Sequence, residues 1–520
     1  MSFKQTIRAV CGLFVAVMGT GATLAYFEES IPMSLNPLYA KTMADYRAQE
    51  LIFDRLWFHD AITNELKSRV VQKYQVAEAG RAVEITLKSG IRWHNGQTLT
   101  SKDLCFTVKA MLNPETPSPI AAHYRQFIAG CDAKGGQTAL IRFKSVLPNP
   151  RERLGFPILP ASEFSSTAIS PDLQFSARPM GTGPFNGKRG LRMVTFDAFA
   201  NTHHTPKIVQ MQLQEGGDPL VQTKTLINNN VQGIVIVPPP QRPDLRASDD
   251  VSMKSYDLRS WWYVAVNPKK AALKDRRVRQ ALNMVINRTE LRQFSFGVKP
   301  GDKNSPCEFI SGPFVRSSPY YNATVPLQPT ANLAKAEALL KSAGLVKTGG
   351  RWHLDGKPIT LRVGMLSNLD NEAPDLLSQV SNQLGAAGFD RQSTKITPDE
   401  WDNSVMAGTS DLDLLIGKWS FGLVEEVNEL FHSKGRQNIF RYENAAVDEV
   451  LQQYDDAVTD NDQRDAYHKL HTLLANDLPY LFLWKLDTKS AWRTEVRGNI
   501  VAPYFYFTEI DGWSVSNSGG

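Results

Sequence analysis

The stretch from Leu87 to Leu112 constrains the fold most, because a strand, a turn and a capped helix follow one another with almost no slack. The apolar residues up to Leu87 alternate with polar ones, as in a half-buried strand, and an Asn-Gly pair then supplies turn chemistry. Thr100 has the position of a helix N-cap, with Asp103 as its capping-box partner three residues later. Asn113 precedes a proline, which predicts the end of this helix.

A second region, residues 359–416, alternates between the hydrophobic periods of strands and helices. The expected elements are a strand over 359–365, a helix over 377–388, a strand over 391–396, a helix over 398–406 and a strand over 412–416. This alternation predicts an α/β protein with a parallel sheet, and open parallel sheets bind ligands outside the carboxyl ends of their strands. The loops at 366–371 and 418–422 occupy that position, so we expect the binding site there.

Length and composition exclude several classes of function. At 520 residues the chain is too long for one compact core, and two or three domains are expected. The formal net charge of +5 is small, and no Lys/Arg run is interleaved with aromatic residues, so no nucleic-acid partner is expected. HExxH, CxxC, GxSxG and P-loop motifs are absent. We therefore expect neither an enzyme nor a bound cofactor.

The first 25 residues have the pattern of a secretory signal peptide. Lys4 and Arg8 precede a short apolar stretch, and small residues follow it. This stretch is too short for a comfortable membrane span, although an uncleaved anchor is the alternative. Cys11 stands before most of the apolar stretch, which argues against lipoprotein attachment. The mature chain is expected to begin between Ala22 and Glu29.

Three cysteines remain after processing, so at most one disulfide can form within the chain. Cys105 and Cys131 fall in the same predicted domain and form one candidate pair, with Cys307 left over. A buried free Cys105 on its helix face is the alternative, and the spacing does not decide between them.

Further short motifs occur in the expected order between about Leu24 and Trp492, on both sides of the first stretch. They are SLNP at Ser34, GTGPF at Gly181, Trp261-Trp262-Tyr263, DRRVRQALNMVINR from Asp275, ANLAKAEALLKSAG from Ala331, DLDLLIGKW from Asp411 and LLANDLPYLFLW from Leu473. Together with Leu87 to Leu112, this series resembles the family 5 extracellular solute-binding proteins, the periplasmic oligopeptide- and dipeptide-binding proteins of ABC importers.

The resemblance implies a two-lobed α/β periplasmic binding protein of type II (cluster C-like), with an extra small α+β domain and a hinge between the lobes. Residues 26–45, 178–258 and 488–515 would form lobe I, residues 46–177 the inserted small domain and residues 259–487 lobe II. The expected function is capture of a peptide or other small solute in the periplasm by a monomer, and delivery to the permease subunits of an ABC transporter. A non-transport sensory or chaperone-like protein with the same fold is the alternative.

The candidate ligand contacts come from the strand-end loops and the inferred hinge. Aromatic side chains give large, stiff contact surfaces in a pocket, although each of them is also a candidate for the core. The aromatic candidates are Trp261, Tyr263, Trp401, Trp419 and Phe421. The polar candidates and their neighbours are Thr42, Asn368, Asp370, Ser420, Gly422 and Glu425.

Two departures from the family pattern concern the substrate. In the dipeptide-binding branch, an aspartate pairs with the ligand's amino terminus and an arginine with its carboxylate, whereas the aligned positions here are Gly422 and Leu369. Burying a charged ligand end without a partner is costly, which argues against zwitterionic dipeptides. Glu425 or Asp370 would be a displaced anchor for an amine. His203 and His204 are expected at the surface, and no metal is expected.

Overall fold

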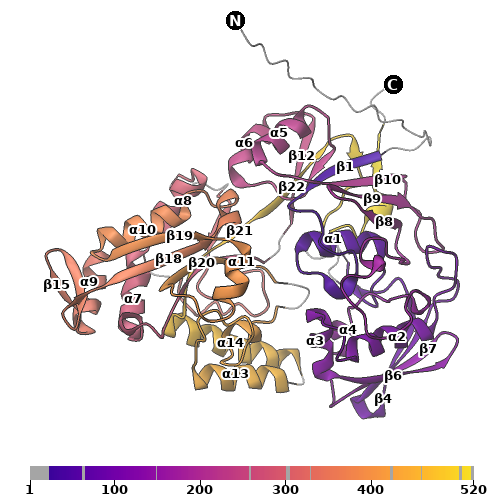
Figure 1. Cartoon of the computed structure of the whole chain (residues 1–520), viewed down its shortest axis with the longest axis horizontal. Coiled ribbons are helices and arrows are strands. Elements are labelled where there is room, and N and C mark those ends of the chain that lie inside the picture. The colour runs from indigo at the N-terminus through magenta and orange to yellow at the C-terminus, as the bar shows by residue number, and fades with distance from the viewer. Residues whose placement is uncertain are drawn as a thin grey trace, which may run out of the picture.

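The computed structural model describes residues 23–60, 65–147, 149–256, 259–299, 305–327, 330–421, 425–457, 459–502 and 506–516. Figure 1 shows two bodies side by side. We call the body with the seven-stranded and four-stranded sheets lobe I, and the body with the six-stranded sheet lobe II. Within the described residues, no helix combines the length and the hydropathy that a membrane crossing requires.

A mixed sheet of seven strands forms the centre of lobe I. Its strands, in spatial order, are β12 (Val251–Tyr256), β22 (Thr488–Arg493), β11 (Gly233–Ile234), β1 (Thr23–Glu28), β10 (Gln210–Glu215), β9 (Met193–Ala198) and β8 (Phe185–Arg189). Strand β1 pairs in parallel with both β10 and β11, and Leu24 and Tyr26 on it are completely buried. A chain boundary after residue 25 would therefore divide β1. Residues 1–22, with most of the predicted signal peptide, lie outside the described residues.

The sheet of lobe II has six strands. They are, in spatial order, β14 (Cys307–Phe309), β21 (Tyr480–Leu486), β13 (Trp261–Val266), β20 (Leu414–Trp419), β18 (Thr360–Leu366) and β19 (Asp390–Ile396). The parallel pairs β18–β19 and β18–β20 confirm the sheet predicted from residues 359–416. Two details of that prediction were wrong. Strand β20 continues to Trp419, and the helix over 398–406 is only α11 (Pro398–Glu400) followed by a π-helical turn, Trp401–Val405.

The stretch around Thr100 folds as predicted and belongs to a four-stranded sheet. This sheet consists of β4 (Val71–Ala77), β5 (Ala82–Leu87), β7 (Thr138–Phe143) and β6 (Ile128–Gly135), with α2 (Ser101–Leu112) and α3 (Pro119–Phe127) beside it. Asp103 accepts hydrogen bonds from the backbone N–H and the hydroxyl of Thr100, both at 2.9 Å, which is the expected capping interaction. A disulfide joins Cys105 on α2 to Cys131 on β6, and Cys307 is a buried free thiol.

The remaining elements cover these sheets or form short hairpins. The helices are α1 (Met43–Ile52), α4 (Pro150–Arg153), α5 (Pro219–Ile227), α6 (Arg242–Arg246), α7 (Arg276–Val285), α8 (Arg288–Phe296), α9 (Leu333–Ser342), α10 (Leu376–Ala386), α12 (Asn428–Phe431), α13 (Ala445–Asp456) and α14 (Asp460–Asp477). The short strands are β2 (Phe58–His59), β3 (Leu66–Lys67), β15 (Val346–Thr348), β16 (Arg351–Leu354), β17 (Lys357–Pro358), β23 (Val496–Arg497) and β24 (Ser514–Val515).

Two sequence motifs that are far apart in the chain meet at the end of α1. A Cβ on Gly181 of the GTGPF motif would lie 1.8 Å from the carbonyl oxygen of Ile52, so only glycine fits there. His94 accepts from the Gly181 N–H at its Nδ1 (3.2 Å), and its Nε2 lies 3.1 Å from the Gly183 carbonyl oxygen and donates to it. Burial lowers the pKa of His94 to about 4, so this bridging imidazole is neutral.

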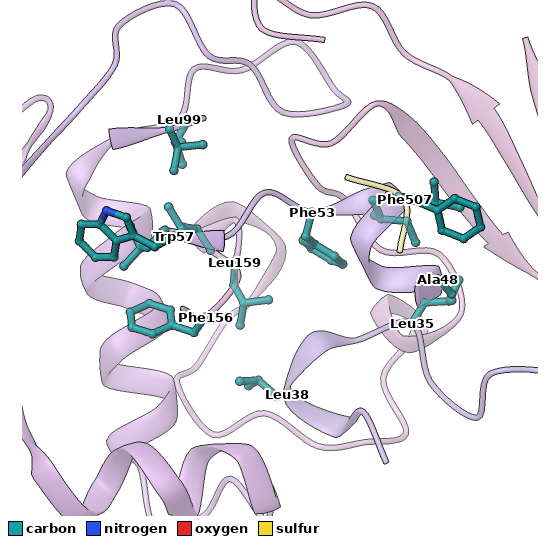
Figure 2. Packing of buried hydrophobic residues seen from close by; sticks show 14 of the residues in the cluster. Leu35, Leu38, Ala48, Phe53, Trp57, Leu99, Phe156, Leu159 and Phe507 are labelled. Atoms are coloured by element: carbon teal, nitrogen blue, oxygen red, sulfur yellow. The ribbon is translucent and has the colours of Figure 1, made fainter. Parts of the chain in front are cut away.

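One hydrophobic cluster extends through both sheets of lobe I. Figure 2 shows Trp57, Phe156 and Leu159 beside α2, and Leu35 and Ala48 around α1, all in the same cluster. Because this core is continuous, the boundaries of a separate small domain at residues 46 and 177 stay a prediction. Lobe II has one cluster on each face of its sheet. The chain passes between the lobes twice, from β12 to β13 and from β21 to β22.

Candidate functional site

A buried arginine holds two glutamates at the carboxyl end of β1. Arg47 on α1 donates to both oxygens of Glu28 (Nη2 to Oε1, 2.6 Å; Nε to Oε2, 2.8 Å), and the two side chains are 2% and 0% exposed. The same guanidinium contacts Glu29 at 3.2 Å, whereas the Glu29 side chain is 41% exposed. At the end of β1, lobe I therefore presents the partly exposed carboxylate of Glu29. A buried ion pair between Arg47 and Glu28 supports it from below the surface.

A second ion pair lies at the carboxyl end of β20 in lobe II. Lys418 Nζ contacts Glu372 Oε2 at 2.6 Å, and both side chains are largely buried, at 15% and 17% exposed. Burial lowers the pKa of Lys418, but attraction by Glu372 and by Glu29 outweighs that effect, and the pKa is raised. Because Glu29 belongs to lobe I, the two charged groups lie close to each other across the junction of the lobes.

A third set of charges links α3 and α4 of lobe I to lobe II. Arg153 Nη1 lies 3.7 Å from Glu426 Oε1, and Figure 1 shows α3 and α4 opposite α13 and α14. Burial and the negative charge of Glu426 raise the pKa of Asp455 on α13 to about 6. Burial lowers the pKa of His123 on α3, although attraction by Glu426 opposes the shift. In this conformation the lobes thus touch near the chain crossings and, away from the crossings, where α3 and α4 meet lobe II.

The structure brings the five aromatic candidates together, but it buries three of them. Trp261, Tyr263 and Phe421 are 0%, 2% and 1% exposed and belong to one hydrophobic cluster of lobe II. We expected Phe421 to face the cleft, and its ring instead packs against Phe314 inside this cluster, with a centroid distance of 6.2 Å. Trp401 and Trp419 are only partly buried against the same cluster, so part of each side chain is exposed.

The polar candidates are divided between existing contacts and open positions. Thr42 caps α1 through Asp45, and Asp370 is paired with Lys395. Glu425, one of the two alternatives for a displaced amine anchor, is buried and paired with Arg259. Asn368 is exposed and Ser420 half-buried, whereas Gly422 lies outside the described residues. Leu369, which aligns with the carboxylate-binding arginine of the dipeptide-binding branch, is buried in the core.

The charged groups at the lobe junction were missed by sequence reasoning. Glu28 is the last residue of β1 and Glu29 directly follows it, which is the same strand-end signal that pointed to residues 418–422 in lobe II. Applying that signal to the N-terminal strand would have found them. No local pattern identifies Glu372 or Arg153, because their partners come from other segments of the chain.

The prediction that the adjacent histidines lie at the surface was wrong. His204 is 3% exposed, and both histidines contact the buried carboxylate of Asp54. Burial lowers the pKa of His204, but attraction by Asp54 and Asp511 outweighs this effect and raises it to about 9. Burial raises the pKa of Asp54, but the histidines outweigh it and hold that pKa well below its usual range. A polar sequence segment therefore folds into the interior, because oppositely charged partners compensate its burial.

Comparison with known proteins identifies the family. Residues 65–438 match the model of the bacterial extracellular solute-binding proteins, family 5 middle region. The oligopeptide-binding protein AppA of Bacillus subtilis is 22% identical over 505 residues, covering 93% of this chain and 89% of that protein.

Solved structures give the same result for the fold. The structure of Bacillus subtilis AppA with a nonapeptide superposes with a TM-score of 0.81 at 20% identity, covering 95% of this chain and 99% of that one. NikZ from Campylobacter jejuni in complex with Ni(L-His) superposes with the same TM-score, identity and coverage. With the two lobes and two chain crossings described above, these matches show that the chain belongs to the bacterial extracellular solute-binding proteins of family 5, which bind peptides or other small solutes for ABC importers.

Proposed function

We propose that this protein is a monomeric periplasmic receptor that closes its two lobes around a solute and presents it to inner-membrane permeases. The signal-like N-terminus supports secretion, and β1 supports cleavage before Thr23, since a later cut would remove part of a buried strand. The proposal includes no catalytic step, and the relatives of this protein are solute-binding proteins.

The observation that carries the proposal is the electrostatic interaction between charged groups of the two lobes where the lobes meet. Glu29 with Arg47 belongs to lobe I, and Lys418 with Glu372 to lobe II. The cavity beside them at the crossings, lined by Pro238, Lys418 and Asp487 among others, measures only about 10 Å³. This cavity is too small for a solute, and a clamp of this type bends at the few connecting residues beside it.

We infer that the cargo is a peptide or peptide-like solute with polar groups along its length. Glu29 and the half-buried Trp419 and Trp401 offer a carboxylate and two aromatic faces. A dedicated arginine for a dipeptide carboxylate is not supported, because Leu369 occupies that position and is buried. The ligands of AppA and NikZ, a nonapeptide and a nickel–histidine complex, differ widely, so the fold alone does not select the cargo.

The test is to identify what the protein carries when it is isolated from the periplasm under native conditions. Small molecules are released by acid and identified by mass spectrometry, and the recovered compound is added back during small-angle scattering. We expect a peptide-class compound that binds once per chain and reduces the radius of gyration. A different class of compound would contradict the proposed cargo, and an unchanged radius at saturation would contradict closure.

A further inference from the structure

Three potential metal ligands meet in the interior of lobe I, away from the junction of the lobes. Asp54 follows α1, and His203 and His204 lie between β9 and β10. One ligand atom from each lies within 4.8 Å of the others. The Nε2 atoms of His203 and His204 are 2.7 Å and 3.0 Å from the two carboxylate oxygens of Asp54. Their side chains are 11%, 2% and 4% exposed, so water scarcely competes for this cluster.

The groups around this cluster orient it as the outer shell of a metal site does. Asp511 Oδ2 lies 2.6 Å from His204 Nδ1, so the carboxylate holds the far nitrogen and leaves Nε2 directed at Asp54. Thr182 donates its hydroxyl to Asp54 Oδ2 at 2.8 Å, and the Thr205 N–H donates to Asp511 at 3.0 Å. A metal-bound imidazole whose other nitrogen donates to a carboxylate is the usual arrangement around zinc.

The ordinary interpretation is an ion pair in which a protonated His204 bridges two aspartates. In that interpretation His203, whose ring lies 4.4 Å from that of His204, donates from Nε2 to Asp54, while its buried Nδ1 has no hydrogen-bond partner among the described residues. Two adjacent imidazoles on one carboxylate repel each other when both are doubly protonated and cationic, whereas one divalent cation can take a lone pair from each of the three groups.

The space for a fourth ligand is also present. A cavity of about 20 Å³ beside the cluster is lined by Asp54 and His204, together with Phe53, Arg55, Pro184 and Ile510 among others. This volume is enough for one water molecule. Two histidines, one carboxylate and one water make up the ligand set of an open tetrahedral zinc site, in which ligand atoms lie roughly 3.3 Å apart.

We propose that Asp54, His203 and His204 form a binding site for a divalent transition-metal ion, with Zn²⁺ the ion of best fit, held in position by Asp511. On binding, both Nε2 atoms would give up their hydrogens: cationic His204 would release its proton to solvent and keep the Nδ1 hydrogen for Asp511, and neutral His203 would shift its hydrogen to Nδ1 by exchange with solvent. The ion would tie the end of α1, the connection between β9 and β10, and the C-terminal segment together, and so stabilise lobe I.

The experiment uses the untagged full chain, stripped with EDTA and transferred to metal-free buffer. One equivalent of ZnCl₂ should bind per chain in equilibrium dialysis with elemental analysis. At a hundredfold excess over the dissociation constant, the melting temperature should rise by about 5 °C or more. Co²⁺ in place of Zn²⁺ should give the visible absorption bands of tetrahedral coordination.

Two variants and one control locate the ion. His203→Gln removes the most exposed ligand, and Asp511→Asn alters only the outer carboxylate, so we expect each to weaken Zn²⁺ binding at least tenfold. His353→Gln is the matched control, because this histidine lies in the β16 hairpin of lobe II and its ring nitrogen Nδ1 contacts the carbonyl oxygen of Arg351 rather than a carboxylate. Retained folding is checked by the melting temperature in EDTA.

Several results would overturn the proposal. One is less than one Zn²⁺ per chain with an unchanged melting temperature. Another is binding that survives both His203→Gln and Asp511→Asn, or that His353→Gln abolishes, because the ion would then lie elsewhere. If His203→Gln does not fold, Asp511→Asn decides alone. The proposed transport function is unaffected by any of these outcomes, since the cluster contains no residue of lobe II.

Discussion

Replacing Phe421 by alanine is predicted to destabilise lobe II without acting directly on the ligand. The ring is 1% exposed and stacks on Phe314, which is itself completely buried. Transfer of a buried phenylalanine side chain to water costs ~1.5–3 kcal/mol. The cavity left in a packed core raises the total to ~3–5 kcal/mol. For a lobe of this size, that loss lowers the melting temperature by roughly 6–20 °C.

Trp419→Ala is the matched comparison, because Trp419 packs against Phe421 edge-on but keeps a partly exposed face. We expect a smaller loss of stability, on the order of 1–2 kcal/mol, and a loss of ~1–4 kcal/mol in binding of the solute recovered from the native protein. Thermal unfolding by scanning calorimetry and titration of that solute give both quantities. The reasoning would be refuted if Phe421→Ala left the melting temperature within about 2 °C of the wild type and weakened binding more than Trp419→Ala does.

Three other perturbations test separate features. Arg153→Met or Glu426→Gln removes the ion pair between α4 and lobe II and should weaken solute binding two- to fivefold, about 0.5–1 kcal/mol, with no further loss in the double variant when binding is titrated. Burial raises the pKa of Glu50 to about 7, so its ionisation lowers stability between pH ~4.5 and ~7. Glu50→Gln should remove that decline and raise the free energy of unfolding at pH 8 by on the order of 1–3 kcal/mol. The prediction would be refuted if the variant and the wild type lost the same amount of melting temperature between pH 5 and pH 8. Reducing the Cys105–Cys131 disulfide, which closes a loop of 26 residues, should cost ~3 kcal/mol in chemical unfolding, and equal stability with and without reductant would contradict it.

The sequence alone was sufficient wherever the structure depends on neighbours a few residues away. The Thr100–Asp103 cap and the end of α2 follow from local hydrogen bonding. The parallel strands β18, β19 and β20 follow from the change of hydrophobic period over residues 359–416. The ordered motifs identified the family, because each motif specifies a local element and their order specifies the arrangement of these elements.

Only the tertiary structure decided which aromatic rings are available to a ligand. Strands β13 and β20 lie inside a sheet with a hydrophobic cluster on each face, so residues of both alternating sets are buried. Alternation distinguishes an exposed face from a buried one, and it carries no information when both faces are covered. Trp261 and Tyr263 therefore belong to the core, although they stand beside the chain crossing.

The charged and metal-ligand clusters likewise needed the folded chain. Arg153 and Glu426 are brought together by the approach of the lobes, and Asp54 and His203 by the packing of α1 on the lobe I sheet. A polar residue in a sequence is expected at the surface, because burying an unpaired charge is costly. Whether it is buried depends on a partner that long-range packing supplies, and no local pattern in this sequence specifies that partner.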